Sequence, residues 1–171
     1  LKIIAILRMA VPYTGMIIST RERPEIRAKA FEIGISQTSA ASKTSPGAYG
    51  DAKREELAQF FLQDNRGLDE VVASILKQNL LPSFCTACYR QGRTGKAFMS
   101  LAEPGLIQNF CRPNAILTFK EYLEDYSSNQ VKKLGSEIIN KYLKQIPDNN
   151  IKEETKLRLK RIKKGERDIY F

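Results

Sequence analysis

The chain has 171 residues, of which 42% are hydrophobic and 27% charged, so its composition is that of an ordinary soluble domain with one buried core. No run approaches the roughly 18 apolar residues that a membrane helix needs, and no secretory leader opens the sequence, so we expect a cytoplasmic protein. The formal charge of +9 invites comparison with nucleic-acid-binding proteins, because clustered Lys and Arg side chains neutralise phosphates.

The first part of the sequence alternates predicted helices and strands. It opens on Leu rather than Met, and apolar residues at helical spacing already occupy positions 1–11, so we expect the chain to begin within a fold. Strand-forming residues at 14–19 and 35–39 flank a predicted helix at 24–33. Helix, strand, helix, strand with short connections is typical of a parallel α/β sheet, so residues 1–50 are predicted to be the last β/α units of a barrel.

Residues 36–50 are rich in Ser, Thr, Ala and Gly, which is the composition of a loop. In β/α barrels the loops after the strands build the active site, so this segment is a candidate ligand contact. Four residues after the preceding strand are candidates for the same reason: Ser19, Thr20, Arg21 and Glu22. A flexible linker between a barrel and a further domain is an equally good interpretation of the composition.

The remainder, residues 51–171, is predicted to be a mainly helical domain. Apolar residues at 68–76 and 131–142 recur at helical spacing. Thr118 with Glu121 fits a capping box, which predicts that a helix begins there. That helix is expected to bury Phe119, Tyr122, Leu123 and Tyr126.

Much of the positive charge lies in residues 152–167, which hold eight Lys or Arg residues against three Glu residues. On a helix, Glu154 lies four residues before Arg158, while Leu159 and Ile162 can face a core. We therefore favour a solvated amphipathic face over a nucleic-acid-binding surface.

The three cysteines, Cys85, Cys88 and Cys111, form a C-x2-C-x22-C pattern in a chain without His. In a reducing cytosol such a pair is usually redox-active or metal-binding. A structural zinc site normally needs four Cys or His ligands. A cubane cluster tolerates three thiolates, because each binds one iron and the fourth iron can accept a non-protein ligand. Metal binding is therefore favoured over a redox pair and over buried inert cysteines.

The segment between the pair and the third cysteine adds Arg90, Arg93 and Lys96, together with three glycines. Positive charge lowers the pKa of thiols and offsets the charge of a cluster. Glycines let backbone amides approach the sulfides. The cations and glycines of this segment are therefore consistent with an iron-sulfur site.

At this point the sequence resembles a known family, the radical SAM tyrosine lyases that mature iron-iron hydrogenase. The resemblance rests on SFCTACYRQGRTG with Cys111 at the matching spacing, and extends through AVPYTGMIISTRE, GISQTSAASKTSPGAYG, QFFLQDNRGLDEVV and FCRPNAILTFKEYLEDY. It thus covers essentially the whole chain.

The resemblance implies a parent enzyme with a full radical SAM barrel, whose first 4Fe-4S cluster cleaves S-adenosylmethionine to a radical that breaks the Cα–Cβ bond of L-tyrosine. The fragments become carbon monoxide and cyanide. An auxiliary 4Fe-4S cluster, held in the family by the motif that is here Cys85, Cys88 and Cys111, carries the assembly site, with its open corner linked through free cysteine to an extra iron. Other hydrogenase maturases are expected partners.

The same resemblance implies that Ser39, Ser42 and Lys43 face the barrel interior where tyrosine and S-adenosylmethionine bind, and Arg21 is a further candidate. The serines can instead cap a turn, and Arg21 can instead pair with a neighbouring Glu. Related lyases of thiamine biosynthesis share the barrel portion and lack the cysteine motif.

The sequence departs from the intact family because it contains no C-x3-C-x2-C radical SAM motif, so this part alone is expected to be inactive. A competing hypothesis is a basic nucleic-acid-binding module stabilised by zinc or a cluster.

Overall fold

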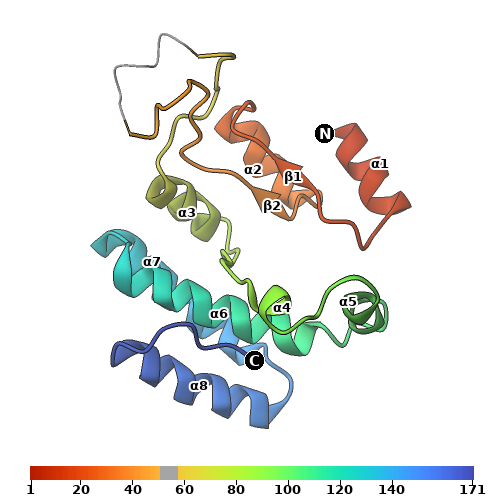
Figure 1. Ribbon diagram of the computed structural model, residues 1–171, viewed down its shortest axis with the longest axis vertical. Helices are drawn as coiled ribbons and strands as arrows, with labels where there is room; N and C mark the ends of the chain where they lie inside the picture. The colour runs from red at the N-terminus through yellow and green to blue at the C-terminus, as the bar shows by residue number, and fades with distance from the viewer. Residues whose placement is uncertain (51–57) are drawn as a thin grey trace. The chain divides into compact units, whose positions relative to one another are not determined.

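The computed structural model describes residues 1–50 and 58–171, which pack as two compact units, Leu1–Val71 and Val72–Phe171. Helices predominate in the described residues (Figure 1). None of these helices is long and apolar enough to cross a membrane. The predicted division between residues 50 and 51 adjoins residues 51–57, which lie outside the described residues, and it stays a prediction.

The first unit contains a β-α-β arrangement after an opening helix. Helix α1 (Lys2–Ala10) is followed by strand β1 (Ile17–Ile18), helix α2 (Pro24–Glu32) and strand β2 (Gln37–Thr38). The two strands run parallel, with Ile17 opposite Gln37 and Ile18 opposite Thr38. The predicted order of elements is confirmed, but each strand is shorter than expected, because a strand extends only where a partner strand lies beside it.

The end of α2 is held by a residue of α1. Gly34 follows the helix with φ +117°, a conformation that side chains rarely adopt. Arg8 donates from Nε and Nη2 to the Gly34 carbonyl at 3.1 and 2.6 Å. A Cβ at Gly34 would lie 2.9 Å from the Arg8 side chain. The glycine is therefore needed both for the backbone turn and for the close approach of α1.

The second unit is helical. In chain order, its helices are α3 (Leu68–Lys77, which begins in the first unit), α4 (Ala87–Arg90), α5 (Gly95–Ala102), α6 (Gln108–Asp125), α7 (Asn129–Lys144) and α8 (Asn149–Lys163). Helix α6 packs against both α7 and α8 (Figure 1). One apolar core joins them, made of Val72, Leu76, Ile116, Phe119, Tyr122, Leu123, Val131, Ile138, Ile139 and Ile146.

The predicted start of a helix at Thr118 is wrong, because α6 begins at Gln108. Thr118 lies inside the helix and donates from its hydroxyl to the Asn114 carbonyl at 2.9 Å. Pro113 also lies inside this helix, although it lacks the amide proton that would bond to the preceding turn. Phe119, Tyr122 and Leu123 are buried as expected. Tyr126, at the end of the helix, is 78% exposed, contrary to expectation.

The basic segment forms α8 as far as Lys163, so most of it is helical, as predicted. Asp148 caps it by accepting from the amides of Asn150 and Ile151 at 2.7 and 3.1 Å. Arg158 pairs with Glu154 at 2.7 Å, and Ile162 is fully buried. After the helix, residues 165–171, here called the strap, fold back toward α6, where Figure 1 marks the end of the chain.

Candidate iron-sulfur site and ligand loops

The three cysteines lie in two neighbouring parts of the second unit. Cys85 lies two residues before α4, Cys88 lies within α4, and Cys111 lies in the first turn of α6. All three are free, with Cys85 and Cys88 half-buried and Cys111 in contact with solvent. The helices thus supply rigid positions for two of the three thiols.

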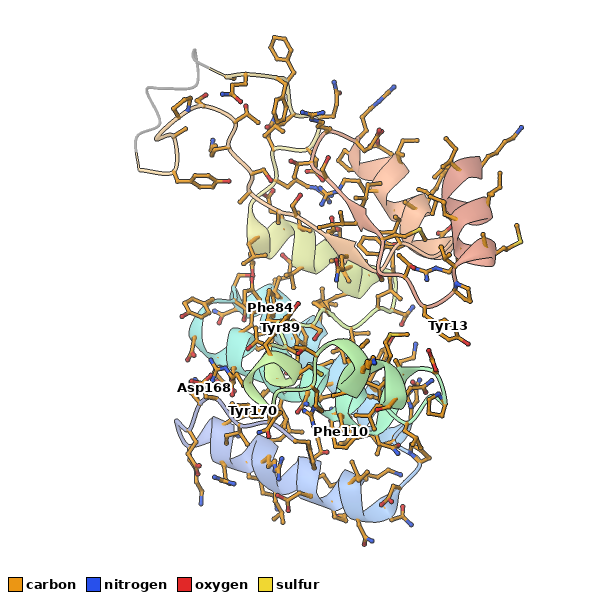
Figure 2. All side chains as sticks on the ribbon, turned by 45° about the vertical axis from the view of Figure 1, so that its right-hand side comes forward. Tyr13, Phe84, Tyr89, Phe110, Asp168 and Tyr170 are labelled. Atoms are coloured by element: carbon orange, nitrogen blue, oxygen red, sulfur yellow. The ribbon has the colours of Figure 1, made fainter. Side chains whose placement is uncertain are left out.

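The segment before α4 is attached to α6 by the residue next to Cys85. The ring of Phe84, labelled in Figure 2, stacks on Tyr122 with 4.9 Å between centroids. The Phe84 amide donates to the Thr118 hydroxyl at 3.4 Å. Thr118 and Tyr122 therefore position Cys85 beside the helix that carries Cys111, which is the role of Thr118 in place of a helix cap.

The surroundings of Cys111 raise the pKa of its thiol. Partial burial raises the pKa of the Cys111 thiol, and the charges of Cys88 and Cys85 raise it further. Arg93 acts in the opposite direction and lowers it. The predicted effect of a cation on a thiol thus occurs at Cys111, through Arg93, but burial outweighs it.

Among the described residues, no three Cys, His, Asp or Glu side chains are arranged to hold one metal ion. A cubane cluster does not require such an arrangement, because its three thiolates bind three different irons. The Nε atom of Arg93 is buried without a hydrogen-bond partner in the described structure, so one polar donor near Cys111 is unsatisfied.

Arg93 contacts both cysteine-bearing segments. Its amide donates to the Cys88 carbonyl at 2.8 Å, and its guanidinium lies 4.6 Å from the centroid of the Phe110 ring. Of the other two predicted cations, Arg90 pairs with Asp168 of the strap at 3.0 Å and Lys96 is exposed on α5.

In the first unit a buried ion cluster, which the sequence analysis missed, lies at the strand ends. Asp64 is 1% exposed and accepts from Arg66 Nε at 2.8 Å and Nη2 at 2.7 Å. Arg27, 2% exposed, donates to the same carboxylate. The hydrogen bond from Arg66, with help from Arg27 and against burial, holds the pKa of Asp64 at about 2. Two cations therefore keep this carboxylate ionised.

This ion cluster holds the loops that follow both strands. Arg27 also donates to the Thr38 hydroxyl and the Ser39 carbonyl after β2. The Thr20 carbonyl after β1 accepts from the amides of Gln63 and Asp64 at 3.0 and 3.1 Å. Only long-range contacts identify this arrangement, since Arg27 and Asp64 are 37 residues apart.

The proposed ligand contacts Arg21, Ser39, Ser42 and Lys43 occupy different positions around these loops. The Arg21 guanidinium lies 3.7 Å from the centroid of the Phe60 ring. Phe60 and Lys43 line an open cavity of about 360 Å³ with Thr44, Ser45, Ala58, Phe61, Leu62 and Asn65. Ser42 is half-buried, and Ser39 is held through its carbonyl by Arg27. The cavity therefore brings together Lys43 and, through Phe60, Arg21.

Comparison with known proteins begins with the first unit. Residues 1–81 match the family model of the Biotin and Thiamin Synthesis associated domain. The chain is 38% identical over 79 residues to 2-iminoacetate synthase of Escherichia coli (strain K12), which is 46% of this chain and 21% of that protein. The 2-iminoacetate synthase of Salmonella typhimurium (strain LT2) is 37% identical over the same shares.

A solved structure of HydG, described as a maturase of the [FeFe]-hydrogenase, is 54% identical over 99% of this chain, with a TM-score of 0.93. The predicted resemblance to HydG is confirmed. HydG from Carboxydothermus hydrogenoformans is 39% identical over 92% of the chain, with a TM-score of 0.67. The chain covers 37% and 32% of these two HydG structures, so it spans about a third of the length of HydG.

The two kinds of match differ in extent. The associated-domain match ends at residue 81, before Cys85, whereas the likeness to HydG includes the unit that carries the cysteines. The family-model match thus leaves out Cys85, Cys88 and Cys111, and the likeness to HydG includes them.

Proposed function

We propose that this chain belongs to a radical SAM tyrosine lyase that makes the carbon monoxide and cyanide ligands of the iron-iron hydrogenase H-cluster, and that it binds the auxiliary 4Fe-4S cluster through Cys85, Cys88 and Cys111. The observation that carries this proposal is the C-x2-C-x22-C pattern of three free cysteines in a chain that is similar to HydG over 99% of its length. The tyrosine lyase reaction is proposed because the chain is similar to HydG.

Three side chains of this chain, those of Cys85, Cys88 and Cys111, would hold the cluster. Each cysteine thiolate would bind one iron, and the positive charge of Arg93 would offset part of the negative charge beside Cys111. A cluster held in this way would keep one iron without a protein thiolate, available to free cysteine and the extra iron of the product. The contact of Phe84 with Thr118 holds the segment of Cys85 against α6.

In the first unit we propose that Arg21, Ser39, Ser42 and Lys43 contribute to the site for L-tyrosine and S-adenosylmethionine. Both ligands carry a carboxylate, for which Arg21 and Lys43 beside the open cavity provide complementary charge. The unit would form the last β/α units of the barrel. Its exposed apolar side chains, such as Ile3 at 72% and Ile17 at 67%, are suited to packing against further units.

This assignment places the radical-generating step in a part of the protein outside these 171 residues, which hold no C-x3-C-x2-C motif. We infer that the chain alone does not cleave tyrosine, that the whole protein works in the cytoplasm, and that other hydrogenase maturases use its product.

Anaerobic reconstitution with iron and sulfide tests the cluster. We expect about four irons per chain, because a cubane contains four, and loss of the cluster in Cys85→Ala. Ser100→Ala is a matched control, since its hydroxyl bonds only to the Ala97 carbonyl within α5. An iron content that is the same in Cys85→Ala and in the unsubstituted chain contradicts the proposal.

The open iron corner has its own test. Added cyanide or free cysteine should change the EPR spectrum of the reduced cluster, because either can bind an iron that lacks a protein ligand. A spectrum indifferent to both would instead indicate four protein ligands.

A basic nucleic-acid-binding module is the second candidate, favoured by the run of Lys and Arg along α8. Three of those cations are already paired with Glu residues, namely Lys156, Arg158 and Arg161. One zinc per chain together with salt-sensitive binding to nucleic acid would support this candidate over the first.

A further inference from the structure

The strap ends on a buried asparagine that follows Cys111 by one helical turn. Asn114 is 1% exposed, and its side-chain amide satisfies both main-chain groups of Phe171. Its Oδ1 accepts from the Phe171 amide at 2.7 Å, and its Nδ2 donates to the Phe171 oxygen at 3.3 Å. A buried amide that is satisfied by one backbone residue fixes that residue in a single position.

The strap also contacts the segment that carries Cys88. Arg93 donates from Nη2 to the same Phe171 oxygen at 2.8 Å. Arg90, in α4, pairs with Asp168 at 3.0 Å and lies 5.8 Å from the centroid of the Tyr170 ring. Asp168 and Tyr170 can be located on the strap in Figure 2. The strap therefore connects the two segments that supply the cysteines.

Independent contacts hold the strap on α6 and α8. The Arg158 guanidinium lies 3.8 Å from the centroid of the Phe171 ring. The Ile169 amide donates to Glu121 at 3.3 Å, and Arg167 pairs with Asp125. Because these anchors lie on helices of the apolar core, the strap presents Arg93 with a fixed acceptor.

Arg93 has one buried donor that lacks a partner in the described structure. Its amide, one terminal nitrogen and the face of its guanidinium are occupied by Cys88, Phe171 and Phe110, while Nε is buried without a partner in the described structure. A buried donor without an acceptor costs free energy, so it is expected to bond to whatever fills the adjoining space. Sulfides and thiolates of a cluster are acceptors for such a donor.

We propose that the strap is a positioning element that holds Arg93 against the cysteine site, where the free Nε–H donates to a cluster sulfide or a ligating thiolate. The inference rests on the proposed cluster site and adds to it a fourth protein contact, outside the cysteine motif. Hydrogen bonds to cluster sulfur stabilise the reduced form and raise the reduction potential.

The test uses the whole chain with three changes: Arg93→Met, Arg93→Lys, and deletion of Ile169–Phe171. After reconstitution, we expect Arg93→Met and the deletion to lose iron to a ferrous chelator at least about tenfold faster than the unsubstituted chain, since one good hydrogen bond to a charged group corresponds to about tenfold. Lys156→Ala, which removes an exposed cation of α8, is the control and should release iron at the original rate.

The reduction potential separates a direct role of Arg93 from a structural one. It should become more negative in Arg93→Met and return part of the way in Arg93→Lys, which restores the charge but not the Nε–H. Unchanged iron release and potential in both Arg93 variants would overturn the inference. A change in iron release with equal potentials would also overturn it, because it would indicate a structural role only.

Hydrogen exchange of the metal-free chain supplies a readout without the cluster. The deletion should speed exchange of the amides at 88–94 while leaving those of α7 unchanged, and equal exchange at 88–94 would contradict the role of the strap. If the deletion unfolds α7 as well, the two Arg93 variants decide the outcome. An unsubstituted chain that holds no cluster would instead overturn the proposed function itself, and with it this inference.

Discussion

The two units of the chain hold their candidate sites by different forces. In Leu1–Val71 the described apolar core is small, consisting of Ile18, Ala30 and Ile35, and the loops after the strands are held by the buried Arg27–Asp64–Arg66 cluster. In Val72–Phe171 a continuous apolar core positions the helices, and the cysteines lie on or beside those helices.

This difference is related to what each site would bind. Loops that receive small polar ligands need directional contacts with accurate placement, which buried ion pairs and hydrogen bonds provide. A cluster needs rigid ligand positions, which packed helices provide. We therefore expect each unit to be sensitive to a different kind of change.

Removal of a core ring should be the most damaging change to the second unit. Phe119→Ala leaves a cavity beneath α7 and should lower the free energy of unfolding by about 4 kcal/mol. Tyr126→Ala, on the exposed end of the same helix, should change it by less than about 0.5 kcal/mol. Unfolding by denaturant, monitored by hydrogen exchange, measures the free energy of unfolding of both variants. Equal decreases in the two variants would show that α6 does not organise the core.

Loss of the buried carboxylate should act on the first unit. Asp64→Asn leaves Arg27 and Arg66 without their counter-charge and should cost about 3 kcal/mol. Glu32→Gln, at the exposed end of α2, is the control for loss of a negative charge. Amide exchange should increase near Thr20 and Ser39 and stay unchanged in α7. Faster exchange in α7 would mean that the ion cluster is not local to its unit.

Acid should lower the stability of the first unit, because it protonates Asp64. The pKa of Asp64 is about 2 in the folded chain against an ordinary 3.8, so its ionised form stabilises folding above about pH 4, and this contribution is lost as the pH falls toward 2. The loss amounts to about 2 kcal/mol.

The second unit contains opposing effects. Burial raises the pKa of Glu121, whereas Lys120 and Lys132 lower that of Glu124. Amide NMR signals between pH 6 and pH 2.5 should therefore report loss of the Thr20 and Ser39 region before loss of α6. The reverse order would contradict the contrast between the units.

A single added methyl group tests the packing of α7 on α6 with the smallest effect. A Cβ at Gly135 would lie 2.7 Å from Leu123 Cδ1 and 3.0 Å from Phe119 Cε1. Gly135→Ala should lower stability by about 1 kcal/mol, because overpacking outweighs the gain in helix propensity. Asn140→Ala, on the exposed face of α7, gains propensity without a clash and should raise stability by a few tenths of a kcal/mol. A stabilising Gly135→Ala would mean that the helices can separate at this point.

Local sequence was enough for most helices and for the family. The apolar spacing of α1, α3 and α7 and the charge pattern of α8 predicted those helices, because a helix is held by bonds between near neighbours. The spacing of Cys85, Cys88 and Cys111, with the segments around them, predicted the likeness to HydG.

Tertiary structure alone decided the features that depend on distant partners. Asp64 and Arg27, separated by 37 residues, meet only when the loops after both strands pack together. The short strands likewise depend on where β1 and β2 meet. Local patterns carry no information about contacts between distant residues. For this reason the sequence predicts a capping box at Thr118, whereas in the structure the Thr118 hydroxyl accepts a hydrogen bond from the Phe84 amide.

Arg93 illustrates the same division. Its position between the cysteines marked it as a cation near a candidate cluster. Its acceptor, the Phe171 oxygen, lies 78 residues away, and only the tertiary structure shows that its Nε is buried without a partner among the described residues.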